Sequence, residues 1–141
     1  MTVTSEATAV WKGGLIDGSG KVTLQSSGKG SFDVNWKARS EGSTSVTTPE
    51  ELIAAAHSAC FNMAFSLALA ENGTPPDSIE TTASVTFTPG TGITGSHLNV
   101  NAVVPGLERD EFDRIADDAK VNCPVSQALR AIEITLEATL A

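Results

Sequence analysis

Basic residues are few in this chain, and acidic ones outnumber them. The 141 residues include 9 Lys and Arg against 17 Asp and Glu, a formal net charge of −8, and no basic run occurs. A chain without a basic patch does not attract polyanions, which argues against a nucleic-acid partner and against an anionic membrane surface. The length favours one domain, residues 1–141, with enough chain to bury a core.

Cysteine is scarce as well, because Cys60 and Cys123 are the only two in the sequence. Residues 1–10, MTVTSEATAV, show no basic segment leading into an apolar one, so we expect a cytoplasmic location. In that compartment thiols stay reduced unless a reaction oxidises them. The two cysteines therefore favour a pair that is oxidised and reduced over a structural disulfide.

Charged residues are absent from residues 52–70, LIAAAHSACFNMAFSLALA. Nineteen residues reach the length of a membrane span. However, alanine is frequent, and Ser58, Asn62 and Ser66 form one polar line at intervals of four. We expect a central helix buried against protein on most sides rather than a membrane segment.

Turn and capping residues divide the chain into strands and helices. Thr48, Pro49 and Glu51 are typical of a helix start, and Gly73 of a helix end. Apolar and alternating patterns predict strands over 7–14, 20–26, 31–37, 79–88, 97–104 and 131–140, a helix over 108–120 and a short helix from Pro124. Strands around helices without regular βαβ alternation predict an α+β fold.

Cys60 lies near the middle of the predicted helix, about 200° around it from Ser58. The same side carries Ile53, Ala56, Met63, Ala64 and Leu67. Free cysteine is often simple core filling, and apolar burial raises a thiol pKa and makes the thiol inert. A reactive Cys60 therefore needs positive charge from another part of the protein.

Cys123 directly precedes Pro124, which places it at the start of the predicted short helix. Free amides and the helix dipole there favour a thiolate, which is also a better leaving group in thiol exchange. A capping residue without chemistry is the alternative. The separation of the cysteines by 63 positions in the sequence does not determine their distance in space.

Three further residues are candidates. Arg39 lies in the loop-like stretch KARSEGSTSVTTPEE, and Glu50 in the first helical turn; either could be solvated only. Glu50 lies about 15 Å along the helix from Cys60, so it could join that site only from a second chain packed antiparallel. His57, one turn before Cys60, could assist deprotonation, although a packed and hydrogen-bonded histidine is the commoner case.

The segments TPEELIAAAHSACF and NCPVSQAL together resemble the OsmC/Ohr family of osmotically inducible and organic hydroperoxide resistance proteins. The resemblance covers nearly the whole chain. AAH before SACF, and an arginine at position 39 with none before it, resemble the OsmC branch. Thr48 stands where the family usually has asparagine, an exchange between two good cap residues.

The resemblance implies an OsmC-like fold, with antiparallel sheets around a central buried helix in an intertwined homodimer. It also implies a thiol peroxidase without metal or bound cofactor. Cys60 matches the peroxidatic cysteine, Cys123 the resolving one, and Arg39 with Glu50 the pair that activates the thiolate. The expected partners are an organic hydroperoxide, a dithiol reductant (a lipoyl group in some members) and a second copy of the chain.

Two other classes of function stay open on the sequence. One is a non-enzymatic binding protein that keeps this fold. The other is a zinc-binding module using His57, Cys60 and Cys123, although no fourth ligand is evident. The sequence leaves the preferred peroxide, the physiological reductant and the inducing stress undetermined.

Overall fold

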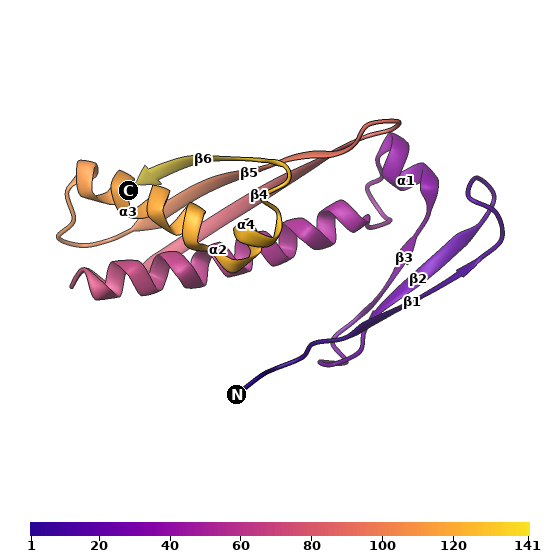
Figure 1. Cartoon of the computed structure of the whole chain (residues 1–141), viewed down its shortest axis with the longest axis horizontal. Coiled ribbons are helices and arrows are strands. Elements are labelled where there is room, and N and C mark those ends of the chain that lie inside the picture. Colours follow the sequence, from indigo (N-terminus) through magenta and orange to yellow (C-terminus); the bar gives the residue numbers. More distant parts are fainter. The chain divides into compact units, whose positions relative to one another are not determined.

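The computed structural model describes residues 1–141, which form two compact units, Met1–Pro49 and Glu50–Ala141. The first unit holds a three-stranded sheet of β1 (Ala7–Lys12), β2 (Ser19–Leu24) and β3 (Ser31–Val34) (Figure 1). Both strand pairs are antiparallel, in the order β1-β2-β3. The predicted meander is confirmed, with each strand somewhat shorter than expected.

The sheet of the first unit has almost no buried core. Ala38 is the only buried residue between positions 1 and 49. Val10, Trp11 and Phe32 are 55%, 42% and 39% exposed. A three-stranded sheet needs its apolar face covered to be stable in isolation. These exposed side chains therefore indicate that another element packs against the sheet.

The third predicted strand ends early, because Asn35 starts a helix. Its side chain accepts a hydrogen bond from the Ala38 amide at 2.7 Å and caps α1 (Trp36–Glu41). Gly42, at φ 89°, ends this helix in a conformation that suits glycine. The prediction of strand to residue 37 and of a loop around Arg39 was therefore wrong, and Arg39 lies in the last turn of α1.

The second unit holds the other sheet, of β4 (Ser78–Thr88), β5 (Gly92–Val103) and β6 (Glu133–Leu140), in the order β4-β5-β6. The α+β class is confirmed, but only one of the two pairings is antiparallel. β4 and β5 form an antiparallel hairpin, whereas β5 and β6 are parallel. The parallel pairing is possible because α3 (Arg109–Asn122) and α4 (Pro124–Ala128) form a crossover between these strands.

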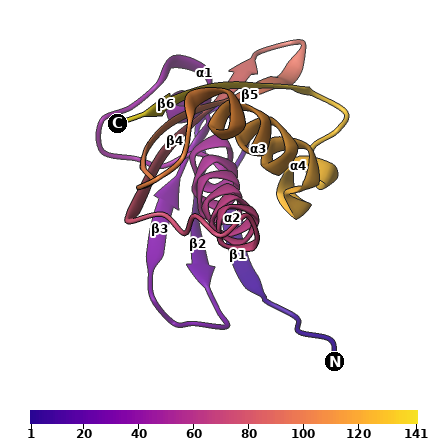
Figure 2. The same cartoon turned by 90° about the vertical axis from the view of Figure 1, so that its left-hand side faces the viewer.

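The long helix α2 (Pro49–Glu71) begins at the predicted Pro49 and stops at the predicted Gly73, whose φ is 81°. One line of residues at intervals of four is fully buried: His57, Phe61, Phe65 and Leu69. The ring of Phe65 lies 5.4 Å from that of Phe61 and 5.5 Å from that of Phe112 on α3. α2 and α3 thus share one apolar core over the sheet (Figure 2).

The other side of α2 is open to solvent in the single chain. Met63 and Leu67 are 73% and 61% exposed, so burial on most sides, as predicted, is wrong for one chain. α2 is the one helix long and apolar enough to cross a membrane. A core helix of a soluble protein meets the same criterion, so the match is weak evidence for a span.

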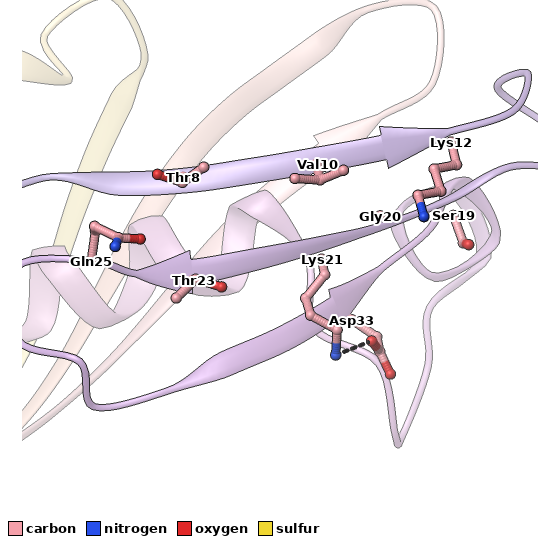
Figure 3. Close-up of a pocket in the computed structure, with 9 residues that line it drawn as sticks. All are labelled: Thr8, Val10, Lys12, Ser19, Gly20, Lys21, Thr23, Gln25 and Asp33. Carbon is pink, nitrogen blue, oxygen red and sulfur yellow. Dashed lines mark ion pairs between the residues drawn. The ribbon is translucent and has the colours of Figure 1, made fainter.

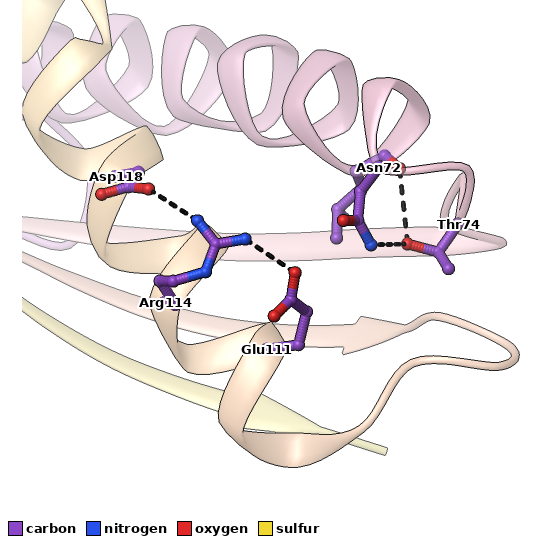
Figure 4. Close-up of polar contacts among 6 residues, drawn as sticks. Asn72, Thr74, Glu111, Arg114 and Asp118 are labelled. Carbon is purple, nitrogen blue, oxygen red and sulfur yellow. Dashed lines mark hydrogen bonds and ion pairs between the residues drawn. The ribbon is translucent and has the colours of Figure 1, made fainter.

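The crossover helices follow the predicted pattern. α3 buries Phe112, Ile115, Ala116 and Ala119, and its outer face carries ion pairs. Arg114 contacts Glu111 at 2.7 Å and Asp118 at 3.2 Å (Figure 4). Such exposed pairs contribute little to stability, so the position of α3 depends on its buried face. α4 begins at Pro124, as predicted.

Candidate active site

The two cysteines come from different elements and meet in the second unit. Cys60 is half-buried on α2, and Cys123 is completely buried between α3 and α4. They lie 3.3 Å apart as free thiols. A disulfide needs its sulfurs about 2.05 Å apart, so only a small movement separates this pair from a covalent bond.

Cys60 lies at the border between the two faces of α2. The predicted neighbours Met63 and Leu67 are exposed, so they do not enclose it. Cys60 packs at the edge of the apolar core instead, together with Ala64 and Ala68 of the same helix. Cys60 is therefore partly buried, at the edge of the core and not inside it.

Cys123 is fixed by its own backbone at the junction of two helices. Its N–H donates to the Ala119 carbonyl at the end of α3. Its carbonyl accepts from the Gln127 amide in α4. Both bonds restrain the junction, so the Cys123 side chain is presented toward α2 by two helices at once.

The start of α4 contacts Cys60. The backbone of Val125 hydrogen-bonds the Cys60 thiol, whereas the Cys123 side chain makes no capping hydrogen bond. The predicted effect of the start of α4 on Cys123 stays a prediction. Pro124 has no N–H, so Val125 supplies the first amide of the helix interior.

The pKa of the Cys60 thiol is raised, and burial is the largest cause. The Val125 amide lowers this pKa, and the adjacent Cys123 raises it again. Burial disfavours the charged thiolate, whereas a hydrogen bond to it favours it. Within the second unit the balance leaves Cys60 protonated at neutral pH, as the apolar surroundings of its helix predicted.

Glu50 and Arg39 belong to different units of the chain. Glu50 is 5% exposed in the first turn of α2. The helical rise puts it about 15 Å from Cys60 along the same helix. Arg39 belongs to the first unit. Their predicted roles at Cys60 stay predictions.

His57 is buried and hydrogen-bonded, as its commoner interpretation predicted. Its Nδ1 lies 2.7 Å from Ser96 Oγ on β5, and its Nε2 lies 2.8 Å from Ser126 Oγ on α4. Burial lowers the pKa of this imidazole, so the ring is neutral at physiological pH. Because both nitrogens are occupied by serine hydroxyls, His57 does not join the two thiols as a third metal ligand.

Ser96, Ser126 and the Val125 amide were not predicted as parts of the site. Serine in a strand or a short helix is common, and only its burial marks these two: Ser96 is 2% exposed and Ser126 4%. The NCPVSQAL segment contains both Val125 and Ser126. The position of a backbone amide over a distant thiol depends on tertiary packing, which no local pattern describes.

Three hollows have neither cysteine in their walls, and the smallest, of about 240 Å³, lies beside Ser96 and His97 of β5. The two larger ones are as follows. One, of about 410 Å³, lies on the first sheet, where Lys21 and Asp33 form an exposed ion pair at 3.0 Å (Figure 3). It is lined by none of the four predicted catalytic residues. The other, of about 620 Å³, lies beside α4 and reaches Ser126, with Lys120 and Arg130 on its wall.

Comparison with known proteins places this arrangement in a family. The sequence model of the OsmC-like proteins matches residues 41–137. Peroxiredoxin OsmC of Escherichia coli (strain K12) is 44% identical over 140 residues, which cover 97% of this chain and 96% of that protein. The chain therefore belongs to the OsmC-like family.

Organic hydroperoxide resistance proteins are also similar. That of Xanthomonas axonopodis pv. citri is 33% identical over 92 residues, 64% of this chain and 65% of its own. The crystal structure of such a protein from Elizabethkingia anophelis covers 100% of this chain and 99% of its own, with TM-score 0.74 and 28% identity. OhrB of Bacillus subtilis gives TM-score 0.70 at 26% identity, covering 97% and 98%. The names of these relatives support a peroxidase-type function in the family.

Proposed function

We propose that this protein is a two-cysteine peroxidase that reduces organic hydroperoxides, and hydrogen peroxide more weakly, to alcohols or water. The observation that carries the proposal is the approach of half-buried Cys60 to buried Cys123 at 3.3 Å. Cys60 is partly exposed, whereas Cys123 is completely buried. This asymmetry suits a peroxidatic and a resolving cysteine, and family membership supports the same assignment.

The chemistry proceeds in three balanced steps. The Cys60 thiolate attacks the outer oxygen of ROOH, the O–O bond breaks, and the alkoxide takes a proton and leaves as ROH. Cys60 becomes a sulfenic acid. The Cys123 thiol attacks that sulfur, the S–O bond breaks, and water leaves with formation of the Cys60–Cys123 disulfide. A dithiol then exchanges with the disulfide, restores both thiols and is itself oxidised to its disulfide.

Arg39 and Glu50 are proposed to activate Cys60. The raised pKa of Cys60 shows why a cation is needed, because a protonated thiol is a poor nucleophile. A guanidinium favours the thiolate by charge and by hydrogen bonding. The carboxylate of Glu50, in turn, is proposed to hold the guanidinium from a second chain.

A homodimer is proposed for this reason and for a second one. Apolar side chains stand exposed on the first sheet and on the outer side of α2, including Trp11, Met63 and Leu67. Contiguous exposed apolar surface is typical of an interface. A second copy covering these surfaces would remove their apolar side chains from water.

The remaining expectations belong to the same proposal. The protein is expected to act in the cytoplasm without nucleic acid or membrane, and its reductant to be a dithiol such as a protein-bound lipoyl group. A parallel assay of cumene, fatty-acid and hydrogen peroxides with dihydrolipoamide, thioredoxin and glutathione identifies substrate and reductant together. The preference for a dithiol follows from the need to reduce an intramolecular disulfide completely.

Substitution of each cysteine tests the central assignment. Cys60→Ser should abolish peroxide reduction, because a hydroxyl is a far weaker nucleophile than a thiolate at neutral pH. Cys123→Ser should allow a single turnover and leave a Cys60 sulfenic acid, measured by dimedone labelling and mass spectrometry. Full multi-turnover activity of Cys123→Ser with dihydrolipoamide would remove the resolving role from Cys123.

A further inference from the structure

We propose that His57 is a positioning residue that holds α4, and with it Cys123 and the Val125 amide, against Cys60 through the hydroxyl of Ser126. The inference rests on the proposed function and concerns the same thiol pair. It assigns a role to a buried network that the three chemical steps do not use. His57 touches no reacting atom in those steps.

The network joins three elements. His57 comes from α2, Ser96 from β5 and Ser126 from α4, and the two hydrogen bonds measure 2.7 and 2.8 Å. All three side chains are buried, His57 completely. A buried hydrogen bond resists exchange with water, and leaving one partner unpaired is costly. The network is therefore a strong link between α2 and α4.

α4 needs such a link. It has only five residues, and a helix of this length is not stable by itself. Ser126 is its only fully buried residue, and Val125 packs partly buried against the apolar core beside it. The hydroxyl of Ser126 is thus the polar part of the contact between α4 and the core.

The spacing on the two helices makes this attachment specific. His57 precedes Cys60 by three residues on α2, and Ser126 follows Cys123 by three residues across the start of α4. The His57–Ser126 bond and the Cys60–Cys123 approach are therefore two contacts between the same two segments. Two contacts fix the rotation of α4 as well as its distance from α2. Val125 lies between them and donates to Cys60.

The imidazole is suited to this task because it is bonded at both ends. Each serine hydroxyl can donate or accept, so a neutral ring satisfies both bonds in either tautomer. The Ser96 bond keeps the ring from turning away from α4. Burial opposes protonation, so the arrangement persists through physiological pH.

The test compares Ser126→Ala with Ser96→Ala. Each removes one oxygen, and each leaves one nitrogen of the same buried ring unpaired, but only Ser126→Ala removes the hydrogen bond between α2 and α4. The measurement is the equilibrium between the protein dithiol and oxidised dithiothreitol, which yields the Cys60–Cys123 disulfide and reduced dithiothreitol. Ser126→Ala should lower that constant about fivefold, the worth of one hydrogen bond. Ser96→Ala should change it less than about twofold.

A second pair of variants distinguishes the positioning of α4 from a general loss of folding stability. In His57→Gln the amide reaches toward the former Nε2 position and can still bond Ser126. In His57→Asn it reaches only toward Nδ1 and Ser96. We expect His57→Gln to retain most of the disulfide constant and His57→Asn to resemble Ser126→Ala. The pH dependence of Cys60 alkylation should shift upward in the same order, because the Val125 amide is lost with α4.

The outcomes distinguish this inference from the proposed function. Equal effects of Ser126→Ala and Ser96→Ala, or of the two His57 variants, would overturn the positioning role. Neither dithiothreitol exchange nor alkylation requires peroxide. If the variants show the expected order but the protein does not turn over peroxide, the positioning role of His57 is upheld and the peroxidase proposal is overturned. If the protein turns over peroxide but the paired variants have equal effects, the peroxidase proposal is upheld and the positioning role is overturned.

Discussion

At the scale of single residues, the chemistry of Cys60 depends on opposing influences. Burial and Cys123 raise its pKa, and the Val125 amide lowers it. The Val125 amide carries only a partial positive charge, whereas a guanidinium carries a full one. A guanidinium near the thiol would therefore lower its pKa more than the amide does. The reactivity of the thiol is therefore sensitive to whether a cation is brought to it.

Replacement of Arg39 measures that sensitivity. Arg39→Ala should raise the Cys60 pKa by about one unit or more and slow its oxidation by peroxide, because an opposite charge nearby shifts a pKa by this amount. Iodoacetamide alkylation against pH and stopped-flow oxidation are the measurements. Arg39→Lys is the control, and it should recover charge but not two-pronged geometry, so its recovery is partial. An unchanged pKa in Arg39→Ala would leave the Val125 amide as activator.

His57 should make stability depend on pH. Its pKa in the folded chain lies below the ordinary value of about 6.5. Just below pH 6.5, His57 is therefore protonated in the unfolded chain but not in the folded chain. The free energy of unfolding should therefore fall on acidification below 6.5, by up to about 1.4 kcal/mol per pH unit from this group. Urea unfolding between pH 5.5 and 7.5 measures the slope. His57→Gln should flatten it; the same slope in that variant would contradict the assignment.

At the scale of elements, α2 has two faces with different duties. The line from His57 to Leu69 builds the core, whereas Met63 and Leu67 are open. Sequence reasoning found the bounds of α2 because capping residues and glycine mark them locally. It misjudged the buried line because the helix is apolar on nearly every side, so periodicity does not show which side meets the sheet.

The same distinction explains the other outcomes. The strands with regular alternation and the helix after Pro124 were predicted, since their signals are local. α1 was missed because a six-residue helix capped by Asn35 resembles a loop in composition. The parallel partner of β5 was missed because pairing across a crossover leaves no mark in either strand. Cys60 and Cys123 were predicted as a pair because they are the only cysteines in the chain. Their contact in space depends on tertiary packing, which the sequence separation does not describe.

Truncation on the two faces of α2 should have different consequences. Phe65→Ala should lower the free energy of unfolding by about 3–5 kcal/mol, because it leaves a cavity among aromatic rings. Leu67→Ala, two residues away, should cost less than about 1 kcal/mol in dilute, monomeric protein. Urea unfolding followed by circular dichroism measures both. Equal losses would mean that Leu67 also faces a core within one chain.

At the scale of the whole molecule, assembly is the main expectation. Light scattering at micromolar concentration should give about twice the 14.6 kDa of one chain. Met63→Asp should shift the mass toward one chain, because a buried charge without a partner is costly at an interface. Val121→Asp is a matched control, since Val121 is an apolar residue that is 64% exposed on a different helix, α3. A monomeric wild-type protein would contradict the dimer.

The parallel pairing of β6 with β5 also sets an order on folding. β4 and β5 are joined by a short turn, so they can pair early, whereas β6 must wait for residues 104–132 to return across the sheet. Cys123 lies in that returning segment. A nascent chain therefore presents two separate thiols, and oxidants that reach it before the last strand joins would produce links between chains instead of a reversible pair. The proposed redox pair is therefore expected to form only after β6 has joined the sheet.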